Sequence, residues 1–153
     1  MKFEQTVTLP ADPVRVWDFV MDVRAVAECI PGIENVEPLG DDRYRMVVKV
    51  KVGPIALTLQ SEIAITERDA VSRTARMRLD AADKRVGGAV KAAMAMRLEP
   101  SAEGTSLVVE TDAQVMGRIG DFGQPMIRRK ADQMLQEVAQ NMRRTLEQAP
   151  HAS

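Results

Sequence analysis

The stretch TSLVVETDAQV (residues 105–115), followed by MGRIGDFGQPMIRRKADQMLQEVAQNMRRTL (residues 116–146), decides the fold. In its first part apolar and polar side chains alternate, which predicts a strand with one buried face. In its second part apolar residues recur at every third or fourth position, which predicts a long amphipathic helix from Arg118 to Leu146. The apolar face of this helix consists of Ile119, Phe122, Met126, Ile127, Ala131, Met134, Val138, Met142 and Leu146.

Segments upstream show the same alternation and are separated by short turns. Residues 3–9, 43–52, 55–65, 73–79 and 90–98 each place apolar side chains on one face. Gly53 and Pro54 form one turn, and Gly87 and Gly88 form another. Strands joined by such short turns run antiparallel, so the pattern predicts about seven antiparallel strands that share one apolar face.

Two short helices are expected after the first strand. Pro13 suits the first turn of a helix over residues 13–20, with Asp12 near its cap, and a second helix over residues 23–29 ends at Pro31 and Gly32. The sheet and the long helix bury their apolar faces together if the sheet curls around the helix. We therefore predict an α+β helix-grip fold. It has a curved seven-stranded antiparallel sheet wrapped around a long C-terminal helix, with two short helices after the first strand.

Length and composition indicate one domain. The chain has 153 residues and no linker, so we expect a single domain over residues 1–148 and a flexible tail over residues 149–153. The lone Cys29 excludes an internal disulfide, and no N-terminal run resembles a signal peptide, so a cytoplasmic protein is expected. No segment reaches the roughly 20 apolar residues that span a bilayer. A pI near 5.9 and few aromatic residues argue against a nucleic-acid partner.

The sequence lacks the residues that most catalytic sites need. The single histidine, His151, lies in the expected tail, which leaves no Ser-His-Asp or Cys-His site and, with one thiol, no zinc site. Cys29 is expected to be a small buried hydrophobe, and carboxylates such as Asp112 and Asp121 are expected to be solvated or to cap helices. The resulting prediction is a protein that is not an enzyme and that has no metal or cofactor.

A curved sheet closed by one helix leaves space between the two, and this space suits a hydrophobic small molecule. The predicted lining is rich in methionine, which adapts to an apolar ligand and fills an ordinary core equally well, so both interpretations stay open. The predicted cavity residues are Tyr44, Met46, Val48, Leu57, Leu59, Met77, Leu79, Met94, Met96, Phe122, Met126 and Met134. Candidate polar groups that would orient a ligand are Tyr44, Ser61, Gln114 and Gln124.

Two segments are candidates for a gate to this space. The first is the loop Ile30, Pro31 and Gly32, and the second is the entrance of the long helix, which contains Gly117 and Gly120. Glycines at the helix entrance would let it lie close to the sheet or hinge away from it. Simple relief of crowding explains these glycines as well.

The outward face of the predicted sheet is basic. Residues 43–97 hold twelve basic and five acidic side chains. A surface of this kind meets an acidic partner or anionic lipid headgroups, with about 1 kcal/mol for each basic residue near a membrane. The alternative is a face that is merely solvated. The predicted docking surface consists of Arg45, Lys49, Lys51, Arg76 and Arg78.

Several short motifs together resemble the G-subunit family of carbon monoxide dehydrogenase, within the START-like (SRPBCC, polyketide cyclase/Bet v 1-like) superfamily. They are Leu9-Pro10-Ala11, Val16-Trp17, Cys29-Ile30-Pro31-Gly32, Lys49-Val50-Lys51-Val52-Gly53-Pro54 and the run from Asp112 to Gly120. The resemblance covers about residues 1–147. It implies a sheet in which the first strand lies beside the seventh.

The resemblance also implies a function. Members of this family are accessory proteins of molybdenum-containing dehydrogenases, concerned with their membrane association and with carrying a hydrophobic electron acceptor such as a quinone. We therefore expect a quinone- or lipid-like ligand, a molybdenum-containing dehydrogenase as partner and peripheral contact with the inner face of the membrane. Two alternatives remain, namely a cyclase or aromatase of the same superfamily and an assembly factor without a ligand.

Overall fold

The alternating segments form one antiparallel sheet of seven strands, in the order β1-β7-β6-β5-β4-β3-β2. The computed structural model describes residues 1–148, so the predicted tail at 149–153 lies outside the described residues. The strands are β1 (Lys2–Leu9), β2 (Ile33–Gly40), β3 (Arg43–Val52), β4 (Ile55–Asp69), β5 (Thr74–Asp83), β6 (Gly88–Ser101) and β7 (Gly104–Gly117). The helices are α1 (Pro13–Val20), α2 (Val23–Ala27), the 3-10 helix η1 (Arg118–Phe122) and α3 (Gln124–Gln148).

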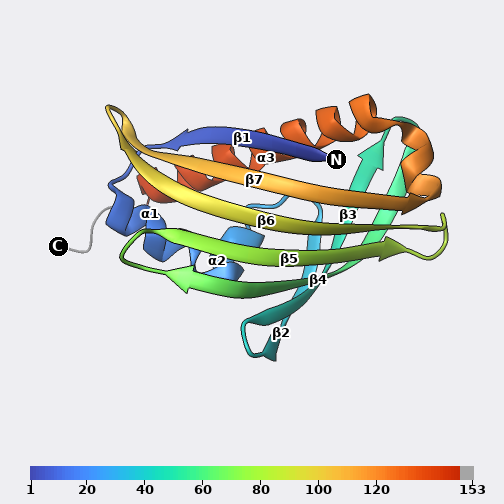
Figure 1. Cartoon of the computed structure of the whole chain (residues 1–153), viewed down its shortest axis with the longest axis horizontal. Coiled ribbons are helices and arrows are strands. Elements are labelled where there is room, and N and C mark those ends of the chain that lie inside the picture. Colours follow the sequence, from blue (N-terminus) through green and yellow to red (C-terminus); the bar gives the residue numbers. More distant parts are fainter. Residues whose placement is uncertain (149–153) are drawn as a thin grey trace.

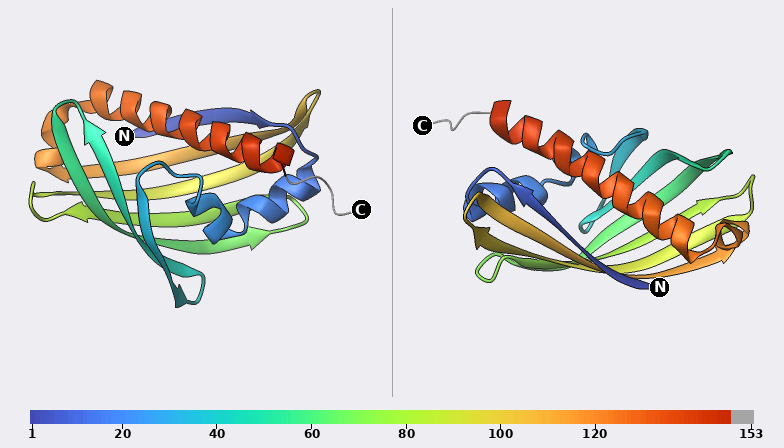
Figure 2. Two further views of the ribbon diagram at one scale, coloured as in Figure 1. Left: turned by 180° about the vertical axis from the view of Figure 1, so that it is seen from behind. Right: turned by 90° about the horizontal axis from the view of Figure 1, so that it is seen from above.

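The sheet is curved, and all three α-helices lie on its concave side. Figures 1 and 2 show α3 running along the concave side, with α1 and α2 beside its C-terminal half. β1 pairs with β7 along its whole length, from Lys2 opposite Asp112 to Leu9 opposite Thr105. The predicted helix-grip fold is therefore confirmed, including the position of the first strand beside the seventh.

The short helices begin where the sequence predicts. The Asp12 side chain accepts a hydrogen bond from the backbone N–H of Arg15 (2.9 Å), and Pro13 opens α1. Asp22 caps α2 in the same way through the N–H of Ala25 (3.2 Å). These caps turn the chain twice between β1 and β2 and place both helices on the concave face.

The long helix begins later than predicted. Residues 118–122 form η1 instead of the first turns of α3, and Gly123, with φ of 84°, separates the two. A non-glycine residue adopts this backbone conformation only with strain, so Gly123 fixes the break. None of the helices within residues 1–148 is long and apolar enough to cross a membrane.

Candidate functional site

The concave side of the sheet carries two separate apolar cores. The first joins β1, β6 and β7 to α1 and the C-terminal half of α3, with Leu9, Val16 and Ala139 completely buried. The second joins β3 and β4 to η1, where Met46, Leu57 and Ile119 are buried. The two cores lie under opposite ends of α3. Any ligand-binding space in the interior would therefore lie between them.

Apolar side chains between the two cores are only half-buried. On the sheet these include Leu79, which belongs to neither core, and its neighbours from both sides. On α3 they include Met134, which packs on the second core, and Val138, which packs on the first. We call this set the inner apolar surface: Ile63, Met77, Leu79, Met94, Met134, Leu135 and Val138. Water reaches part of each of these side chains although they face the interior, so this apolar region is not fully covered.

Small residues line this region on the sheet side. Ala92 lies between Leu79 of β5 and Ala113 of β7 in one row across the sheet, and Ala81 lies beside Ser61 of β4 in the next row. All three alanines are buried. Alanine at these inward positions leaves room that a leucine or phenylalanine would occupy.

The C-terminal half of α3 is held firmly against the rest of the fold. The side-chain amide of Asn141 donates to the Cys29 carbonyl (2.9 Å), and the Arg143 guanidinium donates to the Thr8 carbonyl (2.9 Å). Arg15 of α1 donates to the Leu146 carbonyl (2.5 Å). Together with the buried Met142, these bonds tie the helix to β1, α1 and the end of α2.

The N-terminal half of α3 is held less firmly. The Gln5 side-chain amide donates to the Asp132 carboxylate (2.6 Å), and the Arg128 guanidinium donates to the Lys2 carbonyl (3.3 Å). Both contacts are exposed to solvent. The inward residues Ile127 and Ala131 are half-buried. Since exposed hydrogen bonds and sparse burial mark segments that open easily, we expect this half of α3 to be the movable side of the interior.

The predicted cavity residues divide between these regions. Met46, Val48, Leu57 and Met96 are buried within the two cores, and Tyr44, Leu59 and Phe122 are half-buried against the second core. Met77, Leu79, Met94 and Met134 lie on the inner apolar surface. Met126 is 39% exposed, and a Cβ placed at Gly53 would lie 4.0 Å from its Sδ, so it lies beside the β3–β4 turn at the rim.

The inward polar groups are few. Ser61 is buried and its hydroxyl makes only a long hydrogen bond to the Leu59 carbonyl (3.3 Å), while Tyr44 is half-buried in the neighbouring strand. Gln114 and Gln124 are exposed, and Gln114 pairs with the outward Lys91. Of the four predicted orienting groups, only Tyr44 and Ser61 therefore face the interior.

The two predicted gate segments are both packed closely. The Gly32 carbonyl accepts from the N–H of Lys49 (2.9 Å), and a Cβ at Gly32 would lie 2.2 Å from the Lys49 oxygen. At the other segment the N–H of Arg118 donates to the Gly87 carbonyl (2.6 Å), and a Cβ at Gly117 would lie 2.7 Å from the same oxygen. Gly120 is half-buried in η1, and its carbonyl accepts from the N–H of Gly123 (3.2 Å).

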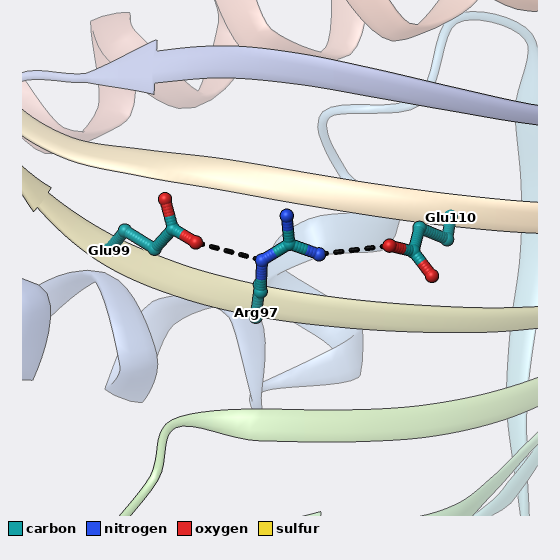
Figure 3. Close-up of polar contacts among 3 residues, drawn as sticks. All are labelled: Arg97, Glu99 and Glu110. Carbon is teal, nitrogen blue, oxygen red and sulfur yellow. Dashed lines mark hydrogen bonds and ion pairs between the residues drawn. The ribbon is translucent and has the colours of Figure 1, made fainter.

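The predicted docking surface lies on the convex face, where it is mixed with carboxylates. Lys49 pairs with Glu34 (3.5 Å) and Arg76 with Glu67 (3.3 Å). Figure 3 shows Arg97 held between Glu99 (2.8 Å) and Glu110 (3.0 Å), which raises the pKa of its guanidinium. Two open hollows of about 620 and 720 Å³ open along the sheet; charged residues such as Asp80 and Arg78 contribute to their lining, and the larger one also reaches Met77 and Met94.

Groups with catalytic chemistry are occupied structurally. Burial raises the pKa of the Cys29 thiol, which donates to the Ala25 carbonyl (3.5 Å). Asp83 is 2% exposed, and its carboxylate accepts from the N–H groups of Thr58, Arg85 and Val86. Among residues 1–148, no three His, Cys, Asp or Glu side chains gather in a way that would hold a metal ion.

Two residues that hold this region together were not predicted from the sequence. Asn141, which secures the α2 end, occupies a helix position that looks like any other polar surface position. The sequence feature that points to its structural role is its position one residue before Met142, at the edge of the apolar stripe of α3. Asp83 is the second. The sequence Asp83-Lys84-Arg85-Val86-Gly87 has the form of a turn in which an aspartate accepts from the following backbone N–H groups.

Comparison with known proteins identifies relatives of this fold. The family model that describes the G subunit of carbon monoxide dehydrogenase (CoxG) matches residues 6–147. No curated protein matches the chain. A similar solved structure is that of a conserved protein from Geobacillus kaustophilus, with 20% identity, a TM-score of 0.88, and coverage of 99% of this chain and 98% of that chain.

Two further solved structures represent the wider group. The Zhui aromatase/cyclase from Streptomyces sp. R1128 has 19% identity and a TM-score of 0.65, over 99% of this chain and 96% of that chain. Ara h 8.0201 has 15% identity and a TM-score of 0.69, over 97% of this chain and 98% of that chain. At these identities the likeness shows the shared fold, which is of the START-like, polyketide cyclase/Bet v 1-like kind.

Proposed function

Because this chain belongs to the G-subunit (CoxG) family of carbon monoxide dehydrogenase, we propose that it holds a hydrophobic, quinone- or lipid-like molecule between its sheet and α3. In this proposal it is an accessory protein of a molybdenum hydroxylase of the carbon monoxide dehydrogenase type. It serves that enzyme by membrane association or by delivery of the electron acceptor. The observation that supports ligand binding is the inner apolar surface, where inward apolar side chains remain half-buried between two complete cores.

The physical basis of binding is desolvation. A hydrophobic chain laid on Met77, Met94 and Met134 would remove apolar area from water, which stabilises the complex by about 25 cal/mol per Å² before ordering costs. Unbranched methionine side chains adjust to the shape of such a chain. The Ser61 and Tyr44 hydroxyls supply the small number of polar contacts that would orient a carbonyl-bearing head group.

Binding without catalysis is the role that these groups support. The most deeply buried carboxylate within residues 1–148, Asp83, already accepts three backbone hydrogen bonds and is not available as a base. The Cys29 thiol has a raised pKa, which disfavours the thiolate needed for nucleophilic attack.

The proposal can be tested by native mass spectrometry and solvent extraction of the purified protein. Met94→Trp adds bulk to the inner apolar surface, whereas Ala93→Trp places the same side chain at the neighbouring exposed position on the convex face. We expect a hydrophobic molecule, co-purified or added as a long-chain quinone, to be retained by the wild type and by Ala93→Trp and lost from Met94→Trp. A wild-type protein that stays empty in the presence of added quinones and lipids would overturn the proposal and favour the assembly factor.

A further inference from the structure

Exposed apolar side chains gather at one end of the molecule. The β3–β4 turn, the β5–β6 turn, η1 and the first turn of α3 lie together at the end opposite α1 (Figures 1 and 2), and we call this the η1 end. It carries Ile55 (37% exposed), Met116 (40%) and Met126 (39%). These are three of the five large apolar side chains that are exposed within residues 1–148.

Contacts between the segments of the η1 end hold these side chains in place. Met126 of α3 lies against Gly53 of the β3–β4 turn, as shown by the 4.0 Å between its Sδ and a Cβ placed there. The Arg85 guanidinium of the β5–β6 turn donates to the Ala56 carbonyl of β4 (3.1 Å). The N–H of Arg118 joins η1 to the same turn through Gly87. Ile55 and Met116 therefore project from turns that backbone and side-chain hydrogen bonds join, whereas Met126 projects from the less firmly held start of α3.

The η1 end is strongly basic although the whole chain has a formal net charge of −1. Residues 51–57, 84–90 and 116–129 contain six exposed basic side chains and one exposed acidic side chain, Asp121. The basic residues are Lys51, Lys84, Arg85, Arg118, Arg128 and Arg129. Within residues 1–148, none of Lys84, Arg118 and Arg129 has a carboxylate within ion-pair distance.

Other surfaces lack this combination. On the convex face Arg43, Arg76 and Arg97 are neutralised by carboxylate partners. The remaining exposed apolar residues, Val14 and Val71, lie at the α1 end, each within two residues of an aspartate, Asp12 or Asp69. An anionic surface would therefore attract the η1 end and leave the α1 end facing away from it.

We propose that the η1 end docks on an anionic lipid surface, with Ile55, Met116 and Met126 entering the headgroup region and the surrounding lysines and arginines contacting lipid phosphates. This inference rests on the membrane association in the proposed function and deepens it by naming the surface and the lipid charge. Apolar side chains that project singly from separate turns suit a bilayer, which adapts around each of them. A protein partner would instead require a broad complementary face.

The test is flotation of the purified protein with vesicles made of equal parts phosphatidylglycerol and phosphatidylcholine, compared with pure phosphatidylcholine. Lys84→Gln and Arg118→Gln each remove one unpaired charge from the η1 end, and each is expected to weaken binding to anionic vesicles about fivefold. Arg24→Gln in α2 is the matched control, since Arg24 is exposed at the α1 end. Met126→Asp should also weaken binding, whereas Val71→Asp, at a side chain that is 94% exposed, should not.

Several outcomes would overturn the proposal. The first is a wild-type protein that binds neither vesicle, and the second is a loss of binding that is as large for Arg24→Gln and Val71→Asp as for the η1 variants. If Lys84→Gln and Arg118→Gln instead weaken capture of a soluble acidic protein while vesicles are ignored, the η1 end is a protein interface. Retention of a hydrophobic molecule is measured separately in Met94→Trp and Ala93→Trp. A failure of docking with retention intact therefore leaves ligand binding standing.

Discussion

Asp83 shows how one residue joins three segments at the η1 end. Its carboxylate accepts from Thr58 of β4 (2.8 Å) and from Arg85 (2.9 Å) and Val86 (3.0 Å) of the β5–β6 turn. The hydrogen bonds from Val86 and Thr58 hold the pKa of this carboxyl below its ordinary value of 3.8. The charged form is therefore the one that the fold stabilises.

We expect Asp83→Ala to lower the urea midpoint of unfolding, because three backbone N–H groups lose their acceptor. Asp80→Ala, at an exposed position on the same strand, is the control and should have little effect. The lowered pKa sets the pH dependence. The stability that Asp83 contributes is present above its unfolded-state pKa and is lost as the pH falls through its folded-state pKa. Asp83→Asn should therefore flatten the acid limb of the stability profile, and an unchanged limb would contradict this assignment.

Gly32 and Gly40 separate two effects of glycine. Both have positive φ, 76° and 87°, but a Cβ at Gly32 would lie 2.2 Å from the Lys49 oxygen, whereas a Cβ at Gly40 would meet nothing within 4 Å. Gly40→Ala should destabilise the protein by about 1 kcal/mol through backbone strain alone. Gly32→Ala should cost clearly more, roughly 3 kcal/mol, because the loop must also leave β3. Chemical denaturation measures both, and equal losses would show that the Ile30–Gly32 loop moves freely.

At the scale of elements, α3 has a fixed half and a movable half. Asn141 and Arg143 bond to the α2 end and to β1, whereas the first half of the helix makes solvent-exposed contacts. We expect backbone amides of residues 126–134 to exchange hydrogen with solvent faster than those of residues 139–146, which hydrogen-exchange mass spectrometry resolves. Equal protection along α3 would show that the helix opens as one unit.

The contribution of Asn141 can be measured separately. Asn141→Ala leaves the Cys29 carbonyl without its donor and should cost about 1–2 kcal/mol of unfolding free energy. Gln5→Ala removes a hydrogen bond from the movable half and serves as the control, with an expected cost within about 0.5 kcal/mol because the contact is exposed. If the two variants lost the same stability, the distinction between the halves of α3 would be wrong.

The sequence predicts some elements better than others for physical reasons. β3 alternates from Tyr44 to Val52 with one exception, the outward Val47, so its buried face can be read directly from the sequence. The alternation does not locate β2, because Pro38 and two irregularities of pairing interrupt it and Asn35 has φ of 54°. The break at Gly123 was missed because the apolar spacing continues across η1 into α3.

The candidate site was predictable only in part. Alternation assigned Met77 and Met94 to the concave face, but whether they are buried or half-buried depends on how far α3 lies from the sheet. The backbone of α3 comes close mainly to β1 and β3, at the two sides of the sheet. The η1 end depends on segments that meet in space, because Ile55 is far in the sequence from Met116 and Met126.

At the scale of the whole molecule, the basic, apolar η1 end and the movable half of α3 adjoin each other. A docked molecule would therefore present the less firmly held side of its interior to the bilayer. The C-terminal half of α3, with Asn141, Arg143 and the first core, lies toward the other end (Figure 2). This arrangement would let a hydrophobic molecule pass between bilayer and inner apolar surface without crossing water.

Docking of this kind should change the rate of ligand loading and leave the final occupancy unchanged. Equilibrium occupancy depends on the free energies of the ligand in lipid and in protein, and not on the route between them. With a long-chain quinone carried in anionic vesicles, Lys84→Gln and Arg118→Gln should each slow loading by about the fivefold expected for docking. Both variants should reach the final occupancy of the wild type. Met94→Trp should reach a lower final occupancy, however fast the ligand loads. Stopped-flow transfer followed by native mass spectrometry measures the two quantities. Loading at the wild-type rate in both charge variants would mean that the ligand reaches the interior by another route.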